Sequence, residues 1–196
     1  PLDAVLEEID ALLHQGVTYV YFIDEIFMPD EALLTALAQR PLSFGVQMRI
    51  DLWSKPQLAL LGEAGCVSIE AGVESISERG RSLLAKRCRL GTEELAELLT
   101  FVKGRVPFVQ ANLLECGEDD RDALRDFRAG LRAQGVWAND PVPLFPYPGS
   151  PEYTKRWGPA DDRAWERAVD HYLSLGGTLS DLQDTRPRPL GELEAP

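Results

Sequence analysis

The chain lacks several features that would assign it to a class of protein at once. Across 196 residues, no apolar run approaches the roughly 20 residues that a membrane-spanning helix needs. No charged segment followed by an apolar stretch marks a signal peptide. Basic residues are few, because 20 Lys and Arg stand against 32 Asp and Glu, for a net charge of −12. Nucleic acids and anionic membranes bind basic patches, so we expect neither as a partner.

Cysteine, histidine and nucleotide-binding glycine motifs are also scarce or absent. Cys66, Cys88 and Cys116 do not have the spacing of metal ligands, and His14 and His171 lie on separate predicted helices. We therefore predict no metal site in this chain, and free thiols that are buried or partly buried in a cytoplasmic protein. No phosphate-binding loop, dinucleotide fingerprint or Gly-x-Ser-x-Gly turn occurs. The sequence indicates no catalytic residue.

Apolar runs alternate with helical patterns along the chain. Strands are predicted at 17–23, 44–50, 66–71, 106–113 and 136–144, the last one irregular because of Pro141 and Pro143. Helices are predicted at 2–15, from Pro29, from Pro56, and at 76–88, 92–103, 119–134 and 159–175. The run at 17–23 is continuously apolar, which indicates a strand that is buried on both faces. This alternation predicts an α/β protein with parallel strands, right-handed crossovers and an open or partial barrel.

Polar side chains follow each predicted strand. In a barrel of this kind the site gathers where the strands end, and these positions carry Asp24 and Glu25, Arg49 and Asp51, Glu70, Glu74 and Ser75, Asn112, Glu115 and Glu118, and Asn139, Asp140 and Tyr147. Asp24 and Glu25 lie within an apolar run, so we expect them to be partly desolvated and to accept hydrogen bonds from an ammonium group. The alternative is that they cap the next helix, for which Asp30 is the better candidate.

Several of these segments resemble the radical S-adenosylmethionine (radical SAM) enzymes, in particular the branch associated with cobalamin. The similar segments, in the family's order, are Phe22-Ile23-Asp24-Glu25-Ile26-Phe27, Arg49-Ile50-Asp51, Gly72-Val73-Glu74-Ser75 and Pro146-Tyr147-Pro148-Gly149-Ser150-Pro151. The resemblance covers residues 1 to about 157. It implies that Asp24 and Glu25 bind the SAM amino group and that Arg49 binds its carboxylate, unless Arg49 pairs with Asp51 or Glu74. Glu74 and Ser75 would face the ribose or the substrate.

The chain departs from the family in two places. No Cys-x₃-Cys-x₂-Cys loop for an iron–sulfur cluster occurs, and Leu114-Glu115-Cys116-Gly117-Glu118-Asp119 replaces the Gly-x-Pro-Gly-Glu-Thr pattern near the SAM adenine. Among the matching positions we also assign Asn112 to cofactor binding. Lys86 matches a family lysine, although we expect a surface lysine there. The turn after Pro146 is expected to be architectural.

The resemblance implies a partial TIM-like (β/α)₆ barrel that lacks its first strand, with about five parallel strands and outer helices. We expect the barrel at 1–157, a C-terminal helix at 158–176 and a Pro-rich tail at 177–196. Pro1 opens directly into a helical pattern, so we expect that a segment with the cluster ligands precedes it.

The implied full-length protein is a cytoplasmic methyltransferase or other group transferase. It would use SAM, a 4Fe–4S cluster, in some members cobalamin, and a reductant protein such as flavodoxin or ferredoxin. It would form a carbon radical that attacks a small-molecule substrate. Two alternatives stay open at this point. One is a non-catalytic scaffold derived from the family, and the other is a barrel hydrolase or lyase that uses the carboxylates.

Overall fold

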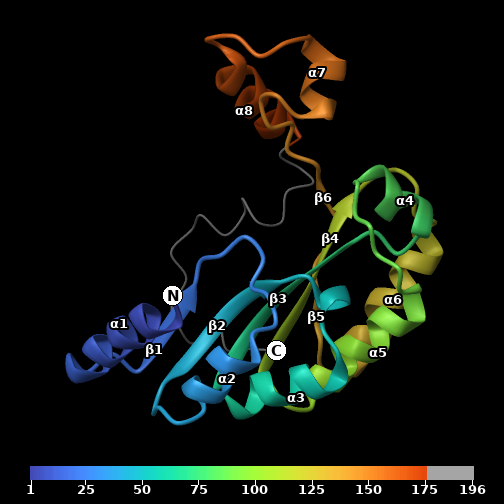
Figure 1. Ribbon diagram of the computed structural model, residues 1–196. Coiled ribbons are helices and arrows are strands. Elements are labelled where there is room, and N and C mark those ends of the chain that lie inside the picture. The colour runs from blue at the N-terminus through green and yellow to red at the C-terminus, as the bar shows by residue number, and fades with distance from the viewer. Residues whose placement is uncertain (176–196) are drawn as a thin grey trace, which may run out of the picture. The chain divides into compact units, whose positions relative to one another are not determined.

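A computed structural model describes residues 1–175 (Figure 1). The strands are β1 (Tyr19–Phe22), β2 (Ser43–Met48), β3 (Cys66–Glu74), β4 (Phe108–Glu115), β5 (Trp137–Ala138) and β6 (Val142–Pro143). The helices are α1 (Leu2–His14), α2 (Glu31–Leu37), α3 (Lys55–Glu63), α4 (Glu78–Leu83), α5 (Thr92–Lys103), α6 (Arg121–Ala133), α7 (Pro151–Trp157) and α8 (Ala164–Ser174), with a short 3-10 helix, η1 (Ile50–Leu52). The tail predicted at 177–196 lies outside the described residues.

The sheet is parallel and follows the order of the chain, β1-β2-β3-β4-β5, with β6 paired to β4. Each neighbouring pair from β1 to β4 is joined through at least one helix, and α2, α3, α5 and α6 follow one another along one side of the sheet (Figure 1). The predicted α/β fold is confirmed, and this is the architecture of a partial TIM-like barrel. Within residues 1–175 no helix combines the length and the apolar character that crossing a membrane requires.

The chain divides into two compact units. The first contains residues 1–113 and 117–139, and the second contains, among the described residues, 114–116 and 140–175. The core of the first unit lies between the sheet and its helices. Among residues 140–175, the second unit has a small core around Tyr153, Ala164 and Ala168, against which Phe145 and Trp157 pack.

The two faces of the sheet differ in burial and in chemistry. The face toward the helices is fully buried and apolar: Phe44, Val46, Met48, Ile69, Ala71, Val73, Val109, Ala111 and Leu113. The side chains between them in sequence are half-buried or exposed: Tyr19, Tyr21, Gln47, Ser68, Glu70, Gln110 and Asn112. We call these seven residues the open face. The prediction that the strand at 17–23 is buried on both faces is wrong, because β1 has one side on the open face, where Tyr19 is 45% exposed.

Helix ends follow from local sequence at most positions. Asp30 accepts a hydrogen bond from the Leu33 amide at 2.9 Å, which confirms it as the cap of α2. Ser54 and Gln57 form a capping box at the start of α3, and Ser150 caps α7. The Pro-rich turn after Pro146 therefore leads into a helix.

One helix prediction needs correction, and the helix predicted at 92–103 is confirmed. The helix expected at 76–88 ends at Leu83, because the chain turns at Ala85 into the left-handed region, with φ of 54°. Thr92 is the first residue of α5, and Gly91 holds the cap position ahead of it. The Thr92 hydroxyl donates instead to the Ile76 carbonyl oxygen.

Candidate functional site

Asp24 and Glu25 follow β1 in a loop between β1 and α2. Both side chains are exposed, and the preceding Ile23 is 90% exposed, so the expected desolvation is wrong. Among residues 1–175 neither carboxylate forms a hydrogen bond or an ion pair. They do not cap α2, because Asp30 does. The loop thus presents two carboxylates to solvent beyond the carboxyl end of β1.

Arg49 follows β2 and forms a two-pronged ion pair with Asp51. Its Nε donates to Asp51 Oδ1 at 3.2 Å, and its Nη2 donates to Asp51 Oδ2 at 2.6 Å. The Asp51 side chain is only 4% exposed, and its carboxylate raises the pKa of the Arg49 guanidinium, with smaller contributions from Cys88 and Glu74. Of the partners weighed for Arg49, Asp51 is the one it contacts. Its Nη1 makes no hydrogen bond within residues 1–175.

Glu74 ends β3 in an unusual conformation and pairs with Lys86. The Glu74 φ is 68°, which is uncommon for a residue with a side chain. Lys86 Nζ donates to Glu74 Oε1 at 2.9 Å and to the Gly72 carbonyl oxygen at 2.6 Å. The expectation of a surface lysine is wrong, because the Lys86 side chain is only 7% exposed.

Ser75 is fully buried in a network that joins the end of β3 to the residues before α6. Its hydroxyl donates to Asp119 Oδ1 at 2.6 Å. The Asp119 carboxylate also accepts from the amides of Ile76 at 3.1 Å and Ser77 at 3.0 Å. The Ser75 side chain is therefore occupied within the protein.

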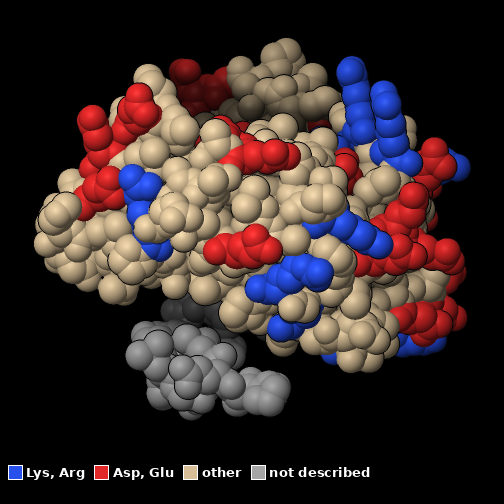
Figure 2. All heavy atoms as spheres, turned by 60° about the horizontal axis from the view of Figure 1, so that its bottom comes forward, with Lys and Arg blue, Asp and Glu red and all other residues tan. Residues whose placement is uncertain are grey.

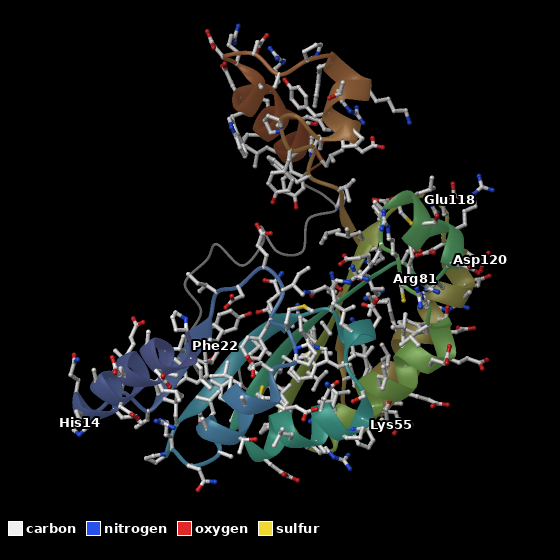
Figure 3. The ribbon with its side chains drawn as sticks, in the orientation of Figure 1. His14, Phe22, Lys55, Arg81, Glu118 and Asp120 are labelled. Atoms are coloured by element: carbon white, nitrogen blue, oxygen red, sulfur yellow. The ribbon has the colours of Figure 1, made fainter. Side chains whose placement is uncertain are left out.

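Arg81 is a buried cation beside this network. It lies on α4 (Figure 3) and is 3% exposed. Its Nη1 donates to the Ser75 carbonyl oxygen at 3.0 Å and its Nη2 to the Leu90 carbonyl oxygen at 3.2 Å. Glu118, in the loop between β4 and α6, pairs with Arg79 of α4 at 2.9 Å. Arg81 thus fixes the turn after β3 to the segment that leads into α5.

Asn112 lies on the open face, where Gln110 Nε2 donates to its Oδ1 at 2.6 Å. On β1, Tyr19 and Tyr21 cover Gly45 of β2. A Cβ atom at Gly45 would lie 2.5 Å from Tyr19 Oη and 2.7 Å from Tyr21 Cδ2. Burial, and then the nearby Glu70 carboxylate, raise the pKa of Tyr21 to about 12.

The predicted residues thus lie in four places. The ends of β2 and β3 bring Arg49 and Glu74 near enough to interact electrostatically. Ser75 belongs to the Asp119 network, and Asn112 lies on the open face. Asp24 and Glu25 lie in a separate, exposed loop.

Sequence reasoning missed Lys86, Asp119, Arg81 and the Tyr21–Glu70 pair. The open face had a readable signal, because polar and aromatic residues recur at every second position within the strands. Asp119 had none, since its partner Ser75 lies 44 residues away in the sequence. Lys86 had a signal in its match to a family lysine, but its partner Glu74 lies 12 residues away and its burial was not readable.

The cysteines of this chain do not form the set of three neighbouring thiolates that holds an iron–sulfur cluster. Cys66, Cys88 and Cys116 are free, and the first is buried, which raises the pKa of its thiol to about 12. Within residues 1–175 no group of three His, Cys, Asp or Glu side chains is placed to hold a metal ion. These residues do not fit a cluster held by three thiolates.

Charge on the surface is mixed. On the face drawn in Figure 2, acidic and basic side chains are interspersed. The whole sequence has 32 acidic and 20 basic residues. We find no continuous basic patch on that face.

Comparison with known proteins places the fold. No protein-family model matches the chain, and no curated protein sequence matches it. Among solved structures, one match is the radical S-adenosylmethionine methyltransferase TsrM from Kitasatospora setae with cobalamin and a [4Fe–4S] cluster bound. The TM-score is 0.60 and the identity 18%, over 75% of this chain and 32% of TsrM.

A second structure of TsrM, with a tryptophan substrate and the SAM analogue aza-SAM bound, matches with a TM-score of 0.65 and 18% identity. That match covers 80% of this chain and 33% of TsrM. The chain therefore spans about one third of the length of TsrM and has the fold of part of a radical SAM methyltransferase. At this identity the likeness shows the fold alone.

Proposed function

We propose that this chain is part of a radical SAM enzyme and that the carboxyl ends of β1, β2 and β3 bind S-adenosylmethionine. The supporting observation is a set of complementary groups at these strand ends, on a fold shared with a radical SAM methyltransferase. The site lies where parallel α/β folds bind their ligands, beyond the carboxyl ends of the strands.

The groups fit the amino-acid end of SAM. Asp24 and Glu25 carry two carboxylates that no cation among residues 1–175 neutralises, and these suit an ammonium group. Arg49 keeps its Nη1 for a carboxylate while Asp51 holds the rest of the guanidinium. In this proposal Glu74 meets a hydroxyl of the ribose. Asn112 lies one strand away from Gly72 in register, and it completes the polar lining.

Ser75 has a different part in this proposal. Its hydroxyl is buried and bound to Asp119, so it orients the turn after β3 and does not itself reach the ligand. This differs from the expectation that Ser75 faces the ribose or the substrate.

Bound SAM would supply, together with a reduced 4Fe–4S cluster, the carbon radical for methylation or another group transfer. The cluster ligands do not come from the described residues, and we propose that they lie elsewhere in the full-length protein. Cobalamin, a small-molecule substrate, a reductant protein such as flavodoxin or ferredoxin, and a cytoplasmic location belong to the same proposal.

The test uses the full-length gene product, purified anaerobically. Iron and sulfide are measured, and the electron paramagnetic resonance spectrum of the reduced protein is recorded with and without SAM. A 4Fe–4S signal that SAM perturbs is the expected result. A protein with no cluster and no SAM binding would contradict the proposal and would favour a non-catalytic scaffold.

A further inference from the structure

We propose that Lys86 is a positioning residue, which holds the Glu74 carboxylate so that its second oxygen accepts a hydrogen bond from a neutral ribose hydroxyl. The inference rests on the proposed function. It adds one residue, Lys86, and explains how the fold positions the Glu74 carboxylate for the hydroxyl.

The backbone around Glu74 is arranged to redirect its side chain. Between Gly72 and Glu74 the register of β3 against β4 shifts, so that Val73 is an extra residue on β3. Glu74 then adopts a φ of 68°. Residues other than glycine are rarely found there, and such positions persist where surrounding contacts hold them, often at functional sites.

The segment that carries Lys86 is unusual in the same way. Ala85 has a φ of 54°, and within residues 1–175 it and Glu74 are the two residues other than glycine with positive φ. The Lys86 amide donates to the Arg81 carbonyl oxygen at 2.9 Å, which ties this turn to buried Arg81 on α4. Both ends of the ion pair are thus supported by left-handed turns that the fold holds in place.

Gly72 provides the space for the pair. A Cβ atom at this position would lie 2.5 Å from Glu74 Oε1 and 3.2 Å from Lys86 Nζ. The bare backbone also lets Lys86 Nζ reach the Gly72 carbonyl oxygen at 2.6 Å. Gly72 and Lys86 together therefore fix the position of Glu74 Oε1.

The exposure of the pair is unequal, and this points to a role beyond holding the fold together. The Lys86 side chain is 7% exposed, whereas the Glu74 side chain is 25% exposed. Glu74 Oε1 binds the lysine, while Oε2 makes no hydrogen bond within residues 1–175. The lysine is the buried support, and the free carboxylate oxygen is the accessible group.

The charge balance selects the kind of ligand. Glu74 is neutralised by Lys86 and lies near Arg49, so a second cation would meet no net negative charge there. A neutral hydroxyl can still donate to the free oxygen. Asp24 and Glu25 have no such cation among residues 1–175, which suits them to an ammonium group.

The test measures discrimination between ligands in the full-length protein. Dissociation constants are determined for SAM and for its 2′-deoxy and 3′-deoxy analogues. In the wild-type protein we expect one of the deoxy analogues to bind about tenfold more weakly than SAM, which is the weight of one hydrogen bond to a charged group. In Lys86→Met we expect the ratio of the two dissociation constants, that of the deoxy analogue over that of SAM, to fall close to one.

Two further variants control for folding. Lys86→Gln keeps a donor for the Gly72 carbonyl but loses the charge, and we expect its ratio to fall as well, which keeps the test decisive if Lys86→Met does not fold. Lys55→Met removes an exposed lysine that pairs with Glu97 on the helical surface, and its ratio should equal that of the wild type.

The outcomes separate the two proposals. If the wild-type protein binds SAM and the Lys86 variants keep its discrimination, the positioning role is wrong and the proposed function stands. Equal binding of all three ligands by the wild-type protein would overturn the positioning role and the contact between Glu74 and the ribose, and would leave SAM binding at the strand ends standing. If the wild-type protein does not bind SAM, the proposed function fails and this inference fails with it.

Discussion

The carboxyl ends of β1 and β3 carry acidic residues in opposite states. After β1, Asp24 and Glu25 are exposed and make no hydrogen bond or ion pair within residues 1–175. After β3, Glu74 is bound to Lys86 and Ser75 is bound to Asp119. One end of the candidate site is therefore built before a ligand arrives, and the other is not.

This difference indicates how the free energy of binding divides between the two ends. Ordering exposed side chains such as those of Asp24 and Glu25 on binding costs about 0.5–1.5 kcal/mol for each side chain. The end of β3 is already ordered by folding, through interactions that should contribute to stability. Substitutions after β3 should therefore change stability as well as binding, whereas substitutions after β1 should change binding alone.

The largest effect on stability is expected from Asp119→Ala. This change removes the acceptor for the buried Ser75 hydroxyl and for the Ile76 and Ser77 amides. Leaving buried donors unpaired costs about 1–3 kcal/mol for each group, so we expect a loss of roughly 2–4 kcal/mol in the free energy of unfolding. Urea denaturation measures this loss.

Asp24→Ala is the matched comparison after β1. An exposed carboxylate without a partner contributes little, so the free energy of unfolding should change by no more than about 0.5 kcal/mol. Equal losses in the two variants would show that the two strand ends are built alike, contrary to the difference drawn between them.

A smaller loss is expected from Gly72→Ala. The added methyl group would lie 2.5 Å from Glu74 Oε1, so the ion pair with Lys86 must shift. Overpacking of this kind typically costs about 1–3 kcal/mol, which thermal unfolding can detect. Gly130→Ala on α6 is the control, since a Cβ atom there has nothing within 4 Å. In a helix this change should stabilise by about 0.5–1 kcal/mol.

The next effect concerns β1 and appears only at high pH. The pKa of Tyr21 is raised from 10.0 to about 12 by burial and Glu70, so its phenol favours the neutral form in the folded protein. Its contribution to stability is full below about pH 10 and is lost as the pH rises through about 12.

The measurement is the absorbance of the phenolate band as a function of pH, in the wild-type protein and in Tyr21→Phe. The difference between the two curves should show one tyrosine that titrates near pH 12. Glu70→Gln should lower that midpoint. A difference curve with a midpoint at the ordinary pKa of 10.0 would contradict the burial of the Tyr21 phenol near Glu70.

The sequence predicts the strands well, because glycine, proline and apolar runs mark them locally. Strands expected from residues 17, 44, 66, 106 and 136 begin at Tyr19, Ser43, Cys66, Phe108 and Trp137. The break in the last strand between Ala138 and Val142 also agrees with the expected effect of Pro141 and Pro143. Once the strands are located, the residues that follow them are known as well. The sequence therefore also predicts that Arg49 and Glu74 lie at the ends of neighbouring strands.

The sequence predicts the partners of these residues poorly. In the sequence, Lys86 is one charged residue in a basic stretch. In the structure, the chain turns at Ala85, and the Lys86 side chain is buried against Glu74. Asp119 lies 44 residues from Ser75, so no local pattern connects them. The exposure of Asp24 and Glu25 is hard to predict for a related reason: an apolar neighbour such as Ile23 is itself exposed once the chain leaves the sheet.

The most direct test of SAM binding at these strand ends is equilibrium binding of SAM to the full-length protein and to its Asp24→Asn/Glu25→Gln variant. Loss of two charged acceptors for the amino group should weaken binding by about tenfold or more. The free energy of unfolding should stay unchanged, because both side chains are exposed. Glu31→Gln, an exposed carboxylate in the first turn of α2, should bind SAM like the wild type. Equal SAM affinity in the wild type and the double variant would contradict the assignment of the carboxylates after β1 to the amino group.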